Sequence, residues 1–236
     1  MQPSYQIQSA PSPVASALAV EAVNAFMWRV YRWMSLGLAA TGLVAMLVAD
    51  SPAAIHIIFG NPILFYGLLI GELGLVVAFT ATATRISAGT AAAMFFSYAA
   101  LNGLTFAAIF IAFTHESIAQ VFFITAGTFA VLSVFGATTK RDLTGVGHFM
   151  LVGLVGLLIG TLVNIFWQNS ALYWVTTYAG VLIFAGLTAY DTQKLRQMFV
   201  LGGGDAANLA LRGALIFYLD FVNLFLLLLR ILGRRR

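Results

Sequence analysis

The stretch ALIFYLDFVNLFLLLLRILG, residues 214–233, is an apolar run long enough to cross a membrane, and it contains an aspartate, Asp220. A lipid-facing carboxylate at the centre of such a helix costs about 2.5–3.5 kcal/mol. We therefore expect Asp220 to face a protein interior or a water-filled path. Asn223 follows one turn later on the same helix face, so this face is polar inside an otherwise apolar helix. The pattern predicts a functional site inside a membrane-spanning bundle.

The composition of the whole chain is that of an integral membrane protein. Of the 236 residues 61% are apolar and 8% are charged, whereas soluble domains carry about 25% charged residues. The short alternating segments of an outer-membrane barrel are absent, so we expect an all-α, polytopic protein. The absence of cysteine excludes a disulfide framework and a thiolate metal site. We attribute the net charge of +4 to loops beside membrane spans and expect no nucleic-acid partner.

Apolar stretches recur along the chain at the length that a helix needs to cross a hydrocarbon core of about 30 Å. The spacing predicts seven spans, near residues 33–49, 62–83, 88–113, 118–138, 146–167, 172–190 and 211–232. Residues 1–26, rich in Ser, Pro, Gln and Ala, predict a mobile cytoplasmic tail before a transmembrane domain over residues 27–236. The GxxxG spacings at residues 67–71 and 156–160 predict close helix packing within the chain.

The lysines and arginines orient the predicted bundle. If the seven spans alternate in direction, the eight of these residues between positions 29 and 212 all fall on one side. Cytoplasmic loops carry an excess of such residues, so we expect a cytoplasmic amino terminus. The basic run RILGRRR, residues 230–236, would then lie outside. Either seven crossings are correct and this end departs from the rule, or the last stretch is re-entrant.

Three acids lie in or beside apolar stretches: Glu72, Asp191 and Asp220. Two of them also have purely structural interpretations. Glu72 could be a protonated packing residue that is hydrogen-bonded to a neighbouring helix. Asp191 could be an interfacial carboxylate near Lys194. Such an interpretation is hardest to sustain for Asp220, because its side chain falls well inside the apolar run.

Three segments resemble the Bax inhibitor-1 family, in particular its bacterial members. They are GVLIFAGLTAYDTQKL (residues 180–195), residues 214–233 with the string YLDFVNLF, and the loop ATTKRDLTGVG (residues 137–147). The resemblance implies a seven-helix bundle with the last helix central, located in the bacterial inner membrane. It also implies a pH-sensitive calcium leak, and association of related proteins with a membrane-bound AAA protease.

The resemblance carries over to individual residues by motif. Asp191 and Asp220 match the di-aspartyl pH sensor of the family, and Glu72 matches an acidic residue in its second helix. The family's sensor is also contacted by an arginine near the end of that helix. The nearest candidate here is Arg85, which lies about two residues beyond the matching position and so faces another direction.

The chemistry of such a pair follows from general principles. Two carboxylates that share a poorly hydrated site cannot both ionise cheaply, so Asp191 and Asp220 would titrate as a unit. A singly protonated pair would tie the last two spans together through a charge-assisted hydrogen bond. Loss of the remaining proton would replace this bond by repulsion. A path lined by these acids, Asn223 and Glu72 offers only oxygen ligands, which suit a hard cation such as Ca²⁺.

These features predict a proton-gated calcium leak channel, with Asp191 and Asp220 as gate and transient calcium ligands. Two alternatives stay open: a non-conducting membrane regulator that binds a membrane protease or another partner through residues 1–26, and a proton-coupled transporter. We expect no enzymatic activity and no cofactor, because the chain has no HExxH motif and no lysine in mid-membrane. The expected partners are the lipid bilayer, calcium and protons.

Overall fold

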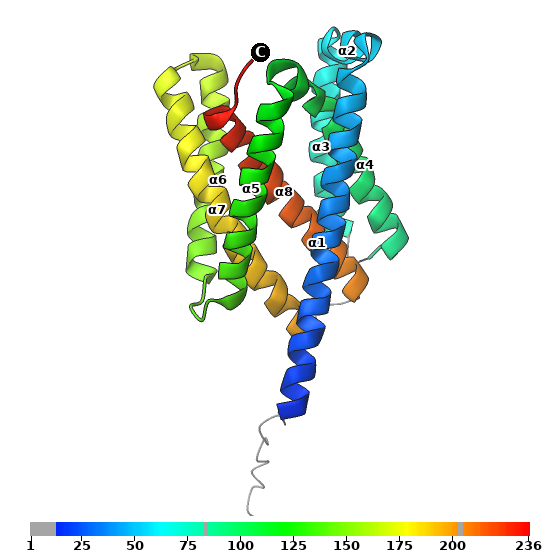
Figure 1. Ribbon diagram of the computed structural model, residues 1–236, viewed down its shortest axis with the longest axis vertical. Helices are drawn as coiled ribbons and strands as arrows, with labels where there is room; N and C mark the ends of the chain where they lie inside the picture. Colours follow the sequence, from blue (N-terminus) through cyan, green and yellow to red (C-terminus); the bar gives the residue numbers. More distant parts are fainter. Residues whose placement is uncertain (1–12, 83–84, 203–204) are drawn as a thin grey trace, which may run out of the picture.

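Each apolar stretch forms a helix, because a backbone inside the bilayer has to satisfy its hydrogen bonds internally. The computed structural model describes residues 13–82, 85–202 and 205–236 (Figure 1). The helices in this part of the chain are α1 (Pro13–Ala49), α2 (Pro52–Phe59), α3 (Pro62–Thr82), α4 (Ala88–Ala112), α5 (His115–Thr138), α6 (Thr144–Trp167), α7 (Ser170–Val200) and α8 (Ala206–Leu232). All except α2 are long and apolar enough to cross a membrane. The fold is the predicted all-α bundle of seven spans.

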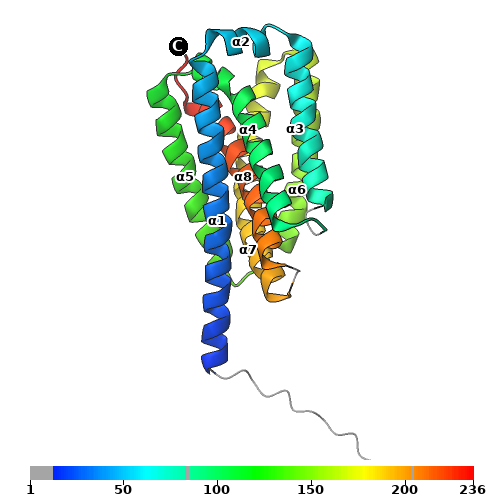
Figure 2. The same ribbon diagram turned by 90° about the vertical axis from the view of Figure 1, so that its right-hand side faces the viewer.

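Helix α8 is the central helix of the bundle, as predicted. Fifteen of its residues are buried, whereas a single residue of α6 is buried. Helices α1, α4, α5 and α7 pack around α8, while α6 packs on α7 and α3 packs on α4 and α2 (Figures 1 and 2). Because α8 is surrounded by protein, a polar residue on it is shielded from lipid on nearly every face. The 27 residues of α8 form one unbroken helix of about 40 Å, which does not fit the re-entrant alternative.

The first helix begins earlier than the sequence analysis predicted. Helix α1 starts at Pro13 and extends beyond the rest of the bundle (Figure 2). The mobile segment predicted over residues 1–26 is therefore helical from residue 13, and residues 1–12 lie outside the described part of the chain. Val23 and Phe26 explain this difference, because both are buried and Phe26 stacks on Phe199 of α7 with ring centroids 4.4 Å apart. Packing against α7 thus extends the helix past the apolar span.

Three of the four glycines in the two GxxxG spacings form no close helix contact. A Cβ at Gly67, Gly71 or Gly156 would meet no atom within 4 Å, so these glycines do not mediate packing as predicted. The prediction holds at Gly160 of α6, where a Cβ would lie 3.1 Å from the Thr176 side chain of α7. A Cβ at Gly136 of α5 would instead fall on the carbonyl oxygen of Ala189 in α7. Glycine at position 136 therefore allows α5 to approach the backbone of α7 directly, two residues from Asp191.

The carboxyl-terminal segment is paired with the connection between α4 and α5. The Thr114 N–H donates to the Arg234 carbonyl at 3.1 Å, and the Arg236 N–H donates to the Ala112 carbonyl at 3.0 Å. The Arg234 N–H donates to the Ser117 hydroxyl at 2.8 Å. These bonds hold the basic run at the end of the bundle where α2 also lies (Figures 1 and 2).

Candidate functional site

Asp191 and Asp220 face one another across the contact between α7 and α8, and their side chains lie within hydrogen-bonding reach. Asp220 is 5% exposed, and its Oδ2 atom has no hydrogen-bond donor among the described residues. Two ionised carboxylates supply only acceptors, so a hydrogen bond between them requires that one carry a proton. The geometry therefore favours a pair that shares one proton and links the two helices.

The length of α7 makes this pairing possible. Helix α7 continues to Val200, more than two turns beyond Asp191, and α8 begins at Ala206. Because the two helices overlap over these turns, the two acids lie at the same level. Lys194, one turn after Asp191, is the cation nearest to it, and its ammonium group lies 5.2 Å from the centre of the Tyr190 ring. Asp191 therefore has a positive charge on one side and Asp220 on the other.

Two of the three segments that resemble the family, the loop of residues 137–147 and residues 180–195, contact each other next to the aspartate pair. The Gln193 side chain accepts a hydrogen bond from the Leu143 N–H at 2.8 Å and donates to the Arg141 carbonyl at 2.9 Å. Gly147, at the start of α6, lies against the ring of Tyr190, where a Cβ would overlap the ring. The loop of residues 137–147 thus fixes the position of α7 at the turn that presents Asp191.

Glu72 belongs to a different cluster from the aspartate pair. Its carboxylate accepts hydrogen bonds from the Thr105 hydroxyl at 2.9 Å and the Asn102 amide at 3.4 Å, both on α4. On α8, Tyr218 points toward this side, because its hydroxyl lies 2.7 Å from that of Thr41 in α1. Positions 218 and 220 face directions about 200° apart on a helix. The body of α8 therefore separates the Glu72 side of the bundle from the Asp220 side.

The other two predicted site residues also lie apart from the pair. The Asn223 amide donates to the Leu219 carbonyl at 2.8 Å, and its side chain lines a cavity between α6, α7 and α8. Arg85 is exposed in the connection after α3. Within the described residues it forms neither a hydrogen bond nor an ion pair with either aspartate. Lys194 is the cation that the structure places near the pair.

One buried polar contact in the centre of the bundle was not predicted from the sequence. Thr41 is buried, and its hydroxyl lies within hydrogen-bonding distance of the carbonyls of Gly37 and Ala99 and of the Tyr218 hydroxyl. A threonine in an apolar helix often bonds to its own backbone, so it gives no signal of a contact between helices. The one sequence feature that indicated this contact was Tyr218, a residue with a hydroxyl group inside the last apolar stretch.

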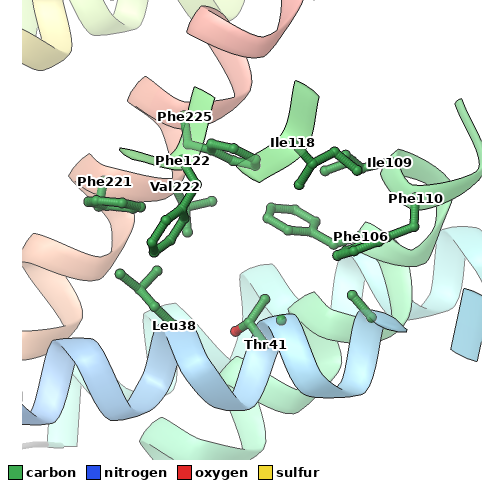
Figure 3. Close-up of a pocket in the computed structure, with 12 residues that line it drawn as sticks. Leu38, Thr41, Phe106, Ile109, Phe110, Ile118, Phe122, Phe221, Val222 and Phe225 are labelled. Carbon is green, nitrogen blue, oxygen red and sulfur yellow. The ribbon is translucent and has the colours of Figure 1, made fainter. Parts of the chain in front are cut away.

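An apolar cavity of about 90 Å³ lies beside this contact, between α1, α4, α5 and α8. Figure 3 shows the residues that line it. Its lining includes the rings of Phe106, Phe122 and Phe225, and Thr41 is the one lining residue with a polar side chain. Neither aspartate of the pair is among the lining residues. A cavity with one hydroxyl group does not offer the several oxygen ligands that calcium requires. We therefore do not assign this cavity to the ion path.

Comparison with known proteins identifies the relatives of this chain. Residues 23–236 match the family described as inhibitor of apoptosis-promoting Bax1. The chain belongs to the Bax inhibitor-1 family. Within it, the chain is similar to the inner membrane protein YbhL of Escherichia coli, with 45% identity over 91% of this chain and 93% of YbhL. It is 41% identical to an uncharacterized protein of Borreliella burgdorferi over 90% of this chain and 93% of that protein. An uncharacterized protein of Caulobacter vibrioides is 37% identical, over 97% of this chain and 96% of its own length.

Family membership confirms the resemblance that was drawn from the loop and the last two helices. The matched residues cover α1 from Val23 onward and every later helix of the Bax inhibitor-1 bundle. The chain is therefore a polytopic membrane protein of this family, and a relative is named for the inner membrane. Among the described residues, no group of three or more His, Asp or Glu side chains gathers as a metal site. The Asp191–Asp220 pair is thus a two-carboxylate site.

Proposed function

We propose that this Bax inhibitor-1 protein is a pH-sensitive calcium leak channel gated by Asp191 and Asp220. The observation that carries the proposal is the buried contact between these two carboxyl groups on adjacent helices. A shared proton holds α7 against the central helix α8. When the pair loses this proton, repulsion between two closely spaced carboxylates, one of them buried, favours separation of the helices. Flux is therefore expected to rise as the pH rises through the titration of the pair.

Calcium is the proposed cargo because the acids nearest the path supply only hard oxygen ligands. Asp191 and Asp220 bind the ion transiently once the helices separate. Glu72 and Asn223 lie on other faces of the bundle, so either residue joins the path only if helices move. Glu72 and the aspartate pair lie on opposite sides of α8. We therefore expect Glu72 to contact the ion at a different point along the ion path from Asp191 and Asp220.

The test is calcium flux into dye-loaded liposomes that contain the full chain, measured between pH 5 and 8. Asp191→Asn and Asp220→Asn keep the shape of each side chain and remove the group that titrates. We expect both variants to flatten the pH dependence of the flux. If the wild-type protein passes no calcium at any pH while a control channel does, the proposal fails.

Asp142→Asn is the matched control for these variants. Asp142 is exposed in the loop between α5 and α6, and hydrogen bonds from the Thr144 hydroxyl and amide lower the pKa of its carboxyl group. Asp142 thus stays ionised throughout the range from pH 5 to 8. A flux profile that changed equally in Asp142→Asn and Asp220→Asn would show that the pair is not the sensor.

We also propose that the amino terminus is cytoplasmic, on the basis of the eight lysines and arginines between positions 29 and 212. The cysteine-free chain allows a direct test with single cysteines at two exposed positions, one at each end of the bundle. In intact spheroplasts, a membrane-impermeant maleimide should label Glu116→Cys and leave Lys140→Cys unlabelled. The opposite pattern would reverse the orientation.

A second candidate function is a non-conducting regulator that binds a membrane protease. The extension of α1 beyond the bundle favours it, because Leu18 is 60% exposed there and Val20 is also exposed (Figure 2). Removal of residues 1–20 takes away Leu18 and Val20 and spares the buried Val23 and Phe26. Under this alternative, the truncation abolishes co-purification of a membrane AAA protease and leaves stability and calcium flux unchanged. Co-purification that survives the truncation would exclude this extension as the binding surface.

A further inference from the structure

The cavity lined by Asn223 has the features of a binding site for an amphiphile. It measures about 150 Å³ and lies between α6, α7 and α8. Five leucines and Phe184 form its apolar lining, and Thr161, Thr176, Asn223 and Arg230 supply the polar groups. Leu158 at its edge is 62% exposed, so the cavity opens toward the lipid side of the bundle. Apolar cavities of about this volume hold a six-carbon ring, so this one has room for part of an acyl chain.

Aromatic side chains show that one end of this cavity lies at the depth of the lipid headgroups. Tyr173, Trp174 and Tyr178 cluster in the first turns of α7, and Trp167 ends α6 beside them. Trp174 and Tyr178 are exposed and stack on each other with ring centroids 5.8 Å apart. Exposed tryptophan and tyrosine residues concentrate at the boundary between hydrocarbon and water. A side chain at the depth of these aromatic residues would therefore contact the phosphate groups of lipids rather than their acyl chains.

Arg230 is the charged residue of this cavity. It lies in the last turn of α8, and its guanidinium carbon is 5.7 Å from the centre of the Tyr173 ring. No carboxylate forms an ion pair with it within the described residues. A guanidinium group can donate two parallel hydrogen bonds to a phosphate, and its charge complements that of an anionic lipid. The positive group and the apolar cavity beside it match the two parts of one lipid molecule.

We propose that this cavity binds an anionic phospholipid from the leaflet in which α8 ends. Arg230 binds the phosphate, and one acyl chain enters the cavity between α6 and α8 past Leu158. Binding rests on this geometry and does not depend on ion conduction. The lipid holds α6 against α8, to which α6 is otherwise connected mainly through α7.

The test is native mass spectrometry of the full chain, titrated with dioleoyl phosphatidylglycerol or dioleoyl phosphatidylcholine. We expect the wild-type protein to bind the first phosphatidylglycerol more tightly than phosphatidylcholine. Arg230→Gln should weaken phosphatidylglycerol binding about five-fold, the effect of one basic residue near a headgroup, and leave phosphatidylcholine binding unchanged. Arg234→Gln removes the same charge at the same end of the bundle but outside the cavity, and should have less than half this effect. Equal losses in the two variants would overturn the proposal.

Two further measurements separate the acyl chain from the headgroup. Leu158→Trp places a bulky side chain at the exposed edge of the cavity and should weaken binding of dioleoyl but not of dihexanoyl phosphatidylglycerol. An unchanged dioleoyl affinity in a variant with unaltered thermal stability would overturn the role of the cavity. Millimolar inorganic phosphate should not displace the lipid. Displacement by phosphate would show that Arg230 binds a free anion.

Discussion

The contact between Thr41 and Tyr218 predicts an asymmetry between two conservative substitutions. Tyr218 is fully buried in α8, and the Thr41 hydroxyl, 2.7 Å away, is its one hydrogen-bond partner in the described structure. Thr41 also has the carbonyls of Gly37 and Ala99 as acceptors, at 3.0 and 2.9 Å. We therefore assign the Tyr218 hydroxyl as the donor to Thr41, because two carbonyls lie within reach of the threonine proton. Thr41 therefore keeps a hydrogen-bond partner when Tyr218 is replaced, whereas the Tyr218 hydroxyl has none when Thr41 is replaced.

The magnitudes follow from what each substitution leaves behind. Tyr218→Phe removes one hydrogen bond and leaves Thr41 bonded to a carbonyl, which should cost about 0.5–1 kcal/mol of unfolding free energy. Thr41→Val leaves the Tyr218 hydroxyl buried without a partner, which should cost about 2–3 kcal/mol. In the double variant no orphaned hydroxyl remains, so addition of Tyr218→Phe to Thr41→Val should restore stability.

Reversible unfolding by sodium dodecyl sulfate in mixed micelles, followed by circular dichroism, measures all three variants under one set of conditions. The decisive quantity is the sign of the effect of Tyr218→Phe in the two backgrounds: destabilising in the wild type and stabilising in Thr41→Val. Additive losses in the double variant would refute the assignment of Tyr218 as the donor. Equal losses in the two single variants would refute it as well.

Three further predictions concern other parts of the bundle. Gly136→Ala should destabilise the protein by about 1–3 kcal/mol in the same unfolding assay, because its Cβ falls on a backbone carbonyl of α7. The control Gly127→Ala on the same helix meets no atom within 4 Å and should stabilise the protein by up to about 1 kcal/mol. The stabilisation due to the lowered pKa of Asp142 is present above about pH 4 and is lost as the pH falls through that lowered value, so the melting temperatures of wild type and Asp142→Asn should differ by a constant amount from pH 5 to 8. Glu72→Gln retains an acceptor for Thr105 and should leave the hydrogen exchange of α3 unchanged, while Glu72→Leu should accelerate it.

Hydropathy predicted the number of spans, because every helix that crosses the hydrocarbon core needs a long run of apolar residues. It did not predict where the helices end. The last turns of α7 contain Lys194 and Arg196, and the first turns of α1 contain Glu21 and Asn24, so neither segment was predicted to belong to a membrane span. Packing such as that of Phe26 on Phe199 extends these helices, and such contacts between distant residues are not visible as a periodic pattern.

The same limit applies to the candidate site. The cost of a carboxylate in an apolar helix singled out Asp220, and the motif resemblance indicated Asp191 as its neighbour. The structure brings the two side chains together. Their role as a sensor stays a prediction. Glu72 shared the same signal of an acid in an apolar stretch. Its separation from the pair depends on which face of α8 each neighbouring helix covers, and the order of spans in the chain does not determine this.

The central position of α8 has a consequence for the biosynthesis of the protein. Helix α8 follows the other seven helices in the chain, so the ribosome makes it after them. Until α8 enters the membrane, α1, α4, α5 and α7 lack the surface against which they pack, and their buried polar groups, Thr41 among them, have incomplete partners. Before α8 is inserted, we therefore expect the earlier helices to be in the membrane without a packed core. Chains interrupted before residue 206 should be substrates for membrane quality control rather than partly active proteins.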